Sequence, residues 1–422
     1  MIWPWQRIWG IGLAGFVIVC CFTAAFGLLA ERLSKTVLTA PMAFIFFGTI
    51  MAWSGLLPAD TAEVLLHPVA EIALIVLLFL DAAQTNLKEL ARSHTWPLRM
   101  LVLGLPMAIL LGTVAAWLIM PGMALVLAAL AAAILSPTDA ALGQAVVTNP
   151  DVPERSRRAL TVESGLNDGL ALPIILMLAS MAAYEMENDA GSWLVFGLKQ
   201  VALGPVVGIV MGYLGGRALI WAKDHNTTSR AYEGASALAL AAGAYTCAGW
   251  IGGNGFIAVF VAGLVFGNVV KTRCPFIYEF AEGDGQILTW GAFLMIGIAL
   301  VPEAITNLSG PMFLLICVSL FIVRPTAIWV SLIGTDAKPL DRLFFGWFGP
   351  RGLATALFAL LILHELPEEI GASVLHLAVN AVWISALLHG VTAVPFGQIY
   401  GRLTQTPDTD QANKTQAREK AS

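Results

Sequence analysis

The sequence contains little charge. Asp, Glu, Lys and Arg make up 12% of the 422 residues and hydrophobic residues 58%, whereas a soluble domain has roughly 25% charged residues. The mean hydropathy is +0.78. A chain with so few charges lacks the polar surface of a soluble domain, so the composition indicates a polytopic, all-α membrane protein.

Features typical of soluble enzymes and of nucleic-acid-binding proteins are scarce as well. The net charge is −5 and the basic residues are spread along the chain, so the sequence gives no sign of a nucleic-acid-binding surface. The five cysteines suggest neither a disulfide nor a metal clip, and no His/Cys cluster suggests a transition-metal site. Long polar loops are missing too, so we expect the function to lie within the membrane and to need no cofactor. The cysteines are Cys20, Cys21, Cys247, Cys274 and Cys317.

Apolar runs of about 20 residues, enough to cross a bilayer, recur along the chain. The first has no clear signal-peptide cleavage site, so we expect it to be retained. Residues 1–402 are expected to form one membrane domain, followed by a short, unstructured polar tail at 403–422. The runs predict thirteen spans, near 8–30, 36–57, 68–86, 98–120, 123–147, 158–184, 193–221, 233–250, 253–270, 285–302, 308–333, 341–365 and 372–400.

The distribution of basic residues predicts the orientation. Most of the 23 lysines and arginines fall in alternate loops and in the tail, and such residues collect on the cytoplasmic side of a membrane. The sequence therefore predicts a multi-pass protein of the cell membrane with its N-terminus outside and its C-terminus in the cytoplasm. The opposite loops contain no Lys or Arg and hold acids such as Asp60, Glu63, Glu185, Glu187, Asp189, Glu365, Glu368 and Glu369.

Two spans contain helix-breaking sequences. Span 5 runs into Ser136-Pro137-Thr138-Asp139, and span 12 contains Gly349-Pro350-Arg351-Gly352. Proline removes a backbone donor and clashes with the preceding turn, so we expect both helices to open. The breaks lie seven spans apart, and an odd offset reverses the orientation in the membrane. Spans 1–6 and 8–13 are therefore predicted to be inverted repeats whose two broken helices cross near the midplane, as in many transporters.

Span 6 carries Glu163, Ser164, Asn167 and Asp168 in an otherwise apolar helix. Charged groups at bilayer depth are costly unless paired, hydrated or ligating, so they are functional candidates. Ser164 and Asp168 share a helix face, and Thr138 and Asp139 come from the opened part of span 5. Carboxylate, hydroxyl, amide and carbonyl oxygens suit a hard monovalent cation. A buried carboxylate also holds a proton, so proton and cation would compete for Asp168.

Three other charged residues within the spans have different expected roles. Glu163 is expected to form a structural ion pair with Arg324 or Arg351, and the sequence does not choose between them. Asp139 is either a ligand or a cap on the broken helix. Asp81 is either a residue of the cytoplasmic funnel or a charge near a helix end.

This combination of motifs resembles the monovalent cation/proton antiporters of the NhaP type, relatives of the animal sodium/proton exchangers. The resemblance covers roughly residues 10–400 and implies that Asp168 carries the ion and the proton, with Asn167, Asp139, Thr138 and Ser164 lining the site. It also implies a homodimer in which a mobile core domain moves against a fixed interface domain. The motifs are Thr138-Asp139, Glu163-Ser164-x-x-Asn167-Asp168, Arg324-Pro325, Gly349-Pro350-Arg351-Gly352 and the stretch 255–264.

The predicted function is exchange of a monovalent cation for a proton by alternating access. Sodium is the first choice, and potassium or lithium also suit the oxygen ligands. Asn167 carries no charge, so Asp168 is the single carboxylate of span 6 that can alternate between a proton and a cation. One-for-one electroneutral exchange is therefore expected. Two rivals are a proton-independent cation channel and an intramembrane aspartyl protease, although Gly283-Asp284-Gly285 lies in a predicted cytoplasmic loop.

Overall fold

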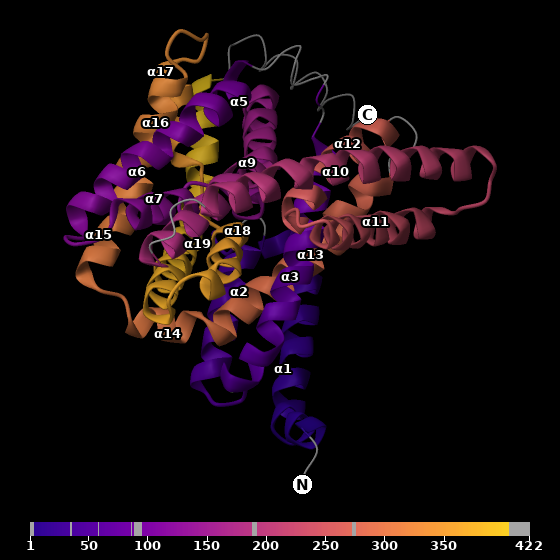
Figure 1. Ribbon diagram of the computed structural model, residues 1–422, viewed down its shortest axis with the longest axis horizontal. Helices are drawn as coiled ribbons and strands as arrows, with labels where there is room; N and C mark the ends of the chain where they lie inside the picture. The colour runs from indigo at the N-terminus through magenta and orange to yellow at the C-terminus, as the bar shows by residue number, and fades with distance from the viewer. Residues whose placement is uncertain are drawn as a thin grey trace, which may run out of the picture.

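The computed structural model describes residues 4–33, 36–57, 59–85, 87, 95–187, 192–271 and 276–404, and all regular secondary structure in these ranges is helical (Figure 1). Helices satisfy their own backbone hydrogen bonds, which an apolar environment demands. The all-α prediction is confirmed for these ranges. Cys274 and residues 405–422, which make up nearly all of the expected tail, lie outside them.

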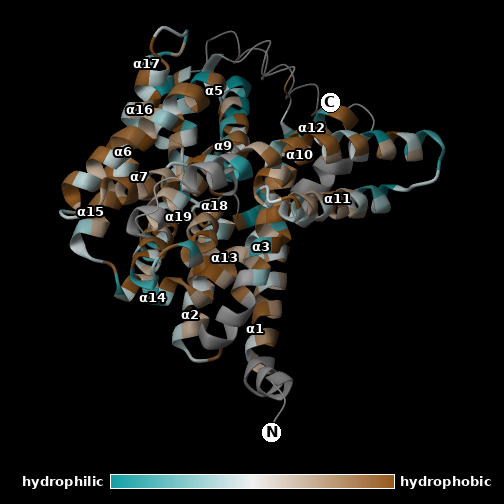
Figure 2. Ribbon diagram, viewed as in Figure 1, coloured by the Kyte–Doolittle hydropathy of each residue, from teal (hydrophilic) through white to brown (hydrophobic). Residues whose placement is uncertain are grey.

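Six of the described helices are long and apolar enough to cross a membrane. Hydrophobic residues cover much of the helical bodies, and hydrophilic ones gather at helix ends and turns (Figure 2). These features support a multi-pass membrane protein. The six segments are Ala14–Leu33, Thr95–Ile119, Glu154–Ala183, Lys199–Asp224, Gly310–Ser331 and Glu368–Thr404.

The helices pack as two groups. In the first, α13 packs on α2 and α3, and α12 packs on α3 and α11. Phe26 of α1 joins this group through edge-to-face contacts with Phe44 and Trp290. The first helix group consists of α1 (Pro4–Leu33), α2 (Ala40–Trp53), α3 (Ala59–Gln84), α11 (Arg230–Trp250), α12 (Gly255–Val270) and α13 (Phe276–Ala299).

In the second group, α7 packs on α6 and α9, α16 on α17, and α19 on α8 and α18. Several of its members, α5, α6, α7, α15 and α16, lie on the left in Figure 1. The second helix group consists of α5 (Thr95–Arg99), η1 (Met100–Gly104), α6 (Leu105–Ile119), α7 (Leu125–Ile134), α8 (Ala140–Val147), α9 (Glu154–Glu187), α15 (Gly310–Val318), η2 (Ser319–Val323), α16 (Arg324–Ser331), α17 (Pro339–Trp347), α18 (Leu353–Leu361) and α19 (Glu368–Thr404).

The long helix α10 (Ser192–Asp224) joins the two halves of the chain, and the short helices α14 (Val301–Thr306) and η3 (Leu363–Glu365) complete the fold. Glycines at every fourth position let α10 approach α12 closely. A Cβ atom on Gly208 would lie 2.6 Å from the Ala258 carbonyl oxygen, and one on Gly212 would lie 2.5 Å from that of Ala262. This glycine row is therefore a packing surface.

The two halves of the chain share irregularities at matching positions. η1 and η2 are π-helical turns, and each leads directly into an α-helix with proline at its second residue, Pro106 or Pro325. Proline cannot donate the backbone hydrogen bond that would continue a regular ladder, and π-turns commonly mark such places. Farther along each half, the backbone is non-helical between α7 and α8 and again between α17 and α18.

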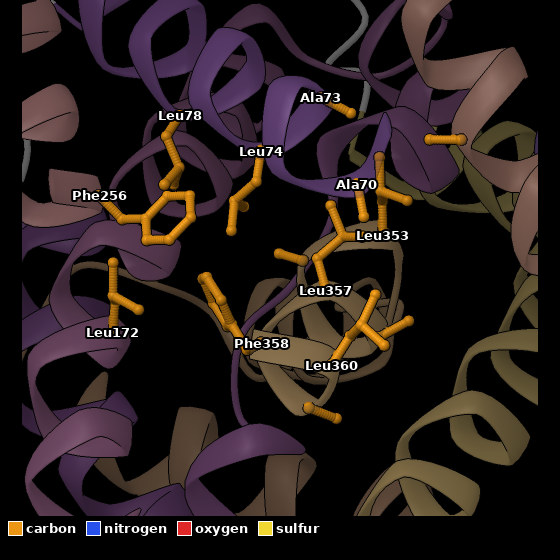
Figure 3. Close-up of a cluster of buried hydrophobic side chains, with 14 of the residues drawn as sticks. Ala70, Ala73, Leu74, Leu78, Leu172, Phe256, Leu353, Leu357, Phe358 and Leu360 are labelled. Atoms are coloured by element: carbon orange, nitrogen blue, oxygen red, sulfur yellow. The ribbon is translucent and has the colours of Figure 1, made fainter. Parts of the chain in front are cut away.

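Apolar side chains close the seam between the two groups. Leu74 of α3 and Leu357 of α18 belong to one buried cluster that also includes Leu172 of α9 and Phe256 of α12 (Figure 3). Leu74 and Leu357 also line a small cavity, and the polar side chains of the seam lie around it.

Candidate functional site

The two non-helical segments meet directly. The Asp139 backbone N–H donates to the Pro350 carbonyl oxygen at 2.9 Å, and the Leu353 N–H donates to Asp139 Oδ2 at 2.7 Å. The Asp139 carbonyl also accepts the first helical bond of α8, from Gly143. The Asp139 carboxylate therefore caps the start of α18, while Asp139 itself precedes the first residue of α8.

Arg351 lies at the C-terminal ends of α7 and α17. Its NH1 donates to the carbonyl oxygens of Ser136 at 3.3 Å and Gly349 at 3.2 Å, just beyond the ends of α7 and α17. A helix carries partial positive charge at its N-terminus and partial negative charge at its C-terminus. Asp139 lies at the N-terminal ends of α8 and α18, and Arg351 lies near the C-terminal ends of α7 and α17, so the helix dipoles stabilise both charges.

Two glycines make this crossing possible. A Cβ atom on Gly352 would lie 1.9 Å from Asp139 Oδ2, and one on Gly349 would lie 1.5 Å from Arg324 Nε. Any larger residue at either position would displace a charged side chain of the site.

Glu163 of α9 pairs with Arg324 of α16. The guanidinium donates from NH1 to Oε1 at 3.1 Å and from NH2 to Oε2 at 3.2 Å, and both side chains are almost fully buried. Such a two-bond pair fixes geometry as well as charge. Of the two arginines that the sequence left open, the structure places Arg324 against Glu163, whereas Arg351 donates to carbonyl groups and to Ser319.

Thr138, Ser164 and Asn167 form a hydrogen-bonded cluster beside this pair. The Thr138 hydroxyl lies 3.2 Å from Glu163 Oε2 and 3.3 Å from Ser164 Oγ, and Asn167 Nδ2 donates to Thr138 Oγ1. All three side chains are buried. Asn167 Oδ1 has no hydrogen-bond partner in the described part of the chain, and the three side chains do not line the neighbouring cavity.

The cavity lies at the seam between the helix groups and has a volume of about 70 Å³. Asp81 of α3, Asp139 and Asp168 of α9 line it together with Thr289 of α13. Asp168 Oδ1 is buried without a hydrogen-bond partner among the described residues, and the groups that act on it electrostatically are all acids. In the described part of the chain these carboxylates do not form a metal-binding cluster.

Three residues of the site were not expected from the sequence. Thr289 reaches the cavity, but an uncharged threonine in an apolar helix gives no distinctive signal. Ser385 and His389 of α19 contact the second break, and His389 is the stronger signal because an ionisable residue deep in a span is a functional candidate in its own right.

Ser385 and His389 hold the break between α17 and α18. The Arg351 backbone N–H donates to Ser385 Oγ at 2.7 Å, Ser385 Oγ lies 3.1 Å from His389 Nδ1, and His389 Nε2 lies 2.9 Å from the Trp347 carbonyl oxygen. His389 Nδ1 also lies 2.9 Å from the Ser385 carbonyl oxygen, so both ring nitrogens are within hydrogen-bond distance of a backbone carbonyl. These hydrogen bonds tie α19 to the break, where the backbone cannot form helical hydrogen bonds.

Ser385→Ala is expected to lower stability by about 1–3 kcal/mol, because it leaves the buried Arg351 N–H without its hydrogen-bond partner. The measurement is the thermal unfolding midpoint in detergent. Ser373→Ala is a matched control, since the Ser373 hydroxyl sits on the exposed part of the same helix and its loss should leave the midpoint unchanged. Equal midpoints for both variants would contradict the positioning role of Ser385.

Comparisons with known proteins agree with this architecture. The structure resembles that of the sodium proton antiporter MjNhaP1 from Methanocaldococcus jannaschii, with a TM-score of 0.76, 18% identity, and coverage of 92% of this chain and 98% of that one. At this identity the likeness shows the fold alone.

Two relatives by sequence are named as K(+)/H(+) antiporters. The NhaP protein of Alkalimonas amylolytica is 28% identical over 368 residues, which is 86% of this chain and 61% of the relative. The NhaP2 protein of Shewanella baltica is 27% identical over 392 residues, which is 89% of this chain and 65% of the relative. The chain thus spans less than two thirds of the length of these relatives. Residues 16–398 match the family described as sodium/hydrogen exchanger, transmembrane, and the chain therefore belongs to that family.

Proposed function

We propose that this protein is a secondary active transporter that exchanges a monovalent cation for a proton by alternating access. The observation that carries the proposal is Asp168, a carboxylate in a small cavity whose Oδ1 has no hydrogen-bond partner in the described part of the chain. A carboxylate at such a place is stabilised either by a proton or by a cation. Competition between the two for one site couples their movements in opposite directions.

The position of the cavity supports alternating access. It lies between the two helix groups, with Asp81 and Thr289 on the first and Asp139 and Asp168 on the second. A shift of the second group against the first would carry Asp168 past the apolar cluster of the seam. In this proposal the first helix group is the fixed interface domain and the second is the mobile core domain.

The proposed membrane arrangement is that of the sequence analysis. Thirteen spans within residues 1–402, with the N-terminus outside and the C-terminus in the cytoplasm, fit the alternation of basic and acidic loops. Matching π-turns and matching non-helical segments in the two halves support inverted repeats with crossing broken helices. A homodimer embedded in lipid, assembled through the interface domain, is proposed from the resemblance to the antiporters.

The cavity favours oxygen-binding cations without choosing among them. Asp81, Asp139, Asp168 and Thr289 offer oxygen ligands only, which suit sodium, potassium and lithium. Sodium is the cation expected from the sequence, and the relatives named as K(+)/H(+) antiporters make potassium an equal candidate. The proposed role of Thr138, Ser164 and Asn167 is to complete the ligand set when the cation is bound, by turning their oxygens toward the cavity.

The function is tested in vesicles that contain the purified protein and a pH-sensitive dye. Adding sodium, potassium or lithium to acid-loaded vesicles should move protons for at least one of these ions. A channel would pass the cation without a coupled pH change, and a protease would cleave a membrane substrate without moving either ion. Absence of proton movement with all three cations would overturn the proposal.

Exchange is expected to be one-for-one and electroneutral. The Asp139 carboxylate is engaged as the cap of α18, and Asn167 carries no charge, so Asp168 is proposed to be the only group that alternates between proton and cation. Transport should then be insensitive to an imposed membrane potential, because a net charge moving through 100 mV would contribute about 2.3 kcal/mol. Currents on a solid-supported membrane that scale with turnover would instead make Asp81 or Asp139 a second carrier.

A further inference from the structure

We propose a second cation site, formed by Glu71 of α3 and Tyr245 of α11, that receives the cation before it reaches the Asp168 cavity. This inference rests on the proposed function and adds an entry site on one side of the membrane. The site is a pocket of about 220 Å³ at the seam between the helix groups. Its walls are Ala70, Glu71, Leu74, Tyr245, Phe256, Leu357, Leu360 and Leu361.

Glu71 and Tyr245 are the polar side chains of this pocket. Glu71 is exposed, and its carboxylate interacts with the Tyr245 hydroxyl. Tyr245 is held in place, because its ring packs edge-to-face on Phe256 with centroids 4.9 Å apart. A Cβ atom on Gly255 would lie 2.4 Å from the same ring, so the glycine is needed for this fit.

The pocket and the Asp168 cavity are separated by a thin apolar layer. Leu74 and Leu357 line both spaces, and both belong to the cluster shown in Figure 3. Along α3, Glu71, Leu74 and Asp81 follow one another from the pocket to the cavity. At 1.5 Å per residue, Glu71 lies about 15 Å along the helix from Asp81.

Helix α18 lines the two spaces in the matching order. Leu360 and Leu361 face the pocket, Leu357 touches both spaces, and Leu353 and Ala354 face the cavity. One helix from each group therefore runs from the pocket to the cavity, with a single leucine layer in between. A movement of α18 against α3 would part Leu74 from Leu357 and join the two spaces.

The chemistry of the pocket fits a monovalent cation that keeps part of its water. One carboxylate and one phenol oxygen supply few ligands, and an exposed carboxylate attracts a cation without removing its hydration shell. The site therefore concentrates the cation beside the leucine layer. Glu71 lies on the N-terminal side of Asp81 along α3, and the basic-residue distribution predicts that the N-terminal end of this helix is outside the cell.

The test measures the apparent cation KM separately from each side of the membrane, in vesicles of known orientation. Glu71→Gln should raise KM by about 3- to 5-fold from the pocket side only, with the maximal rate unchanged. Glu303→Gln is the matched control, since Glu303 is an exposed acid of α14 that faces His376 and lies outside the pocket. That variant should leave KM unchanged from both sides.

Two further variants keep the test decisive if Glu71→Gln does not fold. Glu71→Asp retains the charge and should stay near the wild-type KM, and Tyr245→Phe should raise the pocket-side KM by a smaller factor than Glu71→Gln. An unchanged KM, or one raised equally from both sides, would overturn the entry site. Wild-type exchange is measured first, so its absence would reject the transport function and not this inference alone.

Discussion

Replacing Asp168 by asparagine should abolish cation-driven proton movement while leaving the fold intact. The amide has nearly the shape of the carboxylate but can neither bind a proton at neutral pH nor compensate a cation. Asp168 lines the cavity, and the charged groups acting on it are acids, so removing its charge should relieve repulsion and leave the stability unchanged or raised. The measurement is the pH change in vesicles, with the unfolding midpoint recorded in parallel.

Asp151→Asn is the control for this variant, because Asp151 is exposed and lies away from the cavity. It should transport at the wild-type rate. If Asp168→Asn still exchanges cation for proton, Asp168 is not the carrier. Asp81 and Asp139 would then be the candidates, since both line the same cavity.

The second large effect is expected at the buried pair of Glu163 and Arg324. Glu163→Gln leaves the guanidinium without a counter-charge, and breaking a buried pair in this way costs about 3–5 kcal/mol. Both side chains are no more than 5% exposed, so water cannot compensate. The variant should unfold at a clearly lower temperature in detergent.

A double-mutant cycle assigns this loss to the pair. Glu163→Gln and Arg324→Gln together should cost less than the sum of the single changes, because the second substitution removes the charge that the first left unpaired. The exposed pair of Glu154 and Arg158 on the same helix α9 is the reference, and Glu154→Gln should cost less than about 1 kcal/mol. Strictly additive losses at Glu163 and Arg324 would exclude their interaction.

Local chemistry in the sequence was enough to predict the class of fold. Low charge and repeated apolar runs require helices in a membrane, and Pro137 and Pro350 cannot continue a helix whatever surrounds them. The acids of α9 were recognisable for the same reason, since an isolated charge in an apolar helix stands out without any knowledge of its neighbours. The resemblance to the exchanger family rested on these local motifs and is confirmed by the match over residues 16–398.

Contacts between distant helices could be decided only by the tertiary structure. Arg324 and Arg351 were equal partners for Glu163 in the sequence, but the crossing places Arg351 at two helix C-termini and leaves Arg324 to form the pair. Asp139 was either a ligand or a cap, and the Leu353 N–H, more than 200 residues away, engages it as a cap. Asp81 reaches the same cavity only because α3 packs against α9 and α18. Which side chains meet across a seam depends on how helices rotate and approach one another, and no single apolar run contains that information.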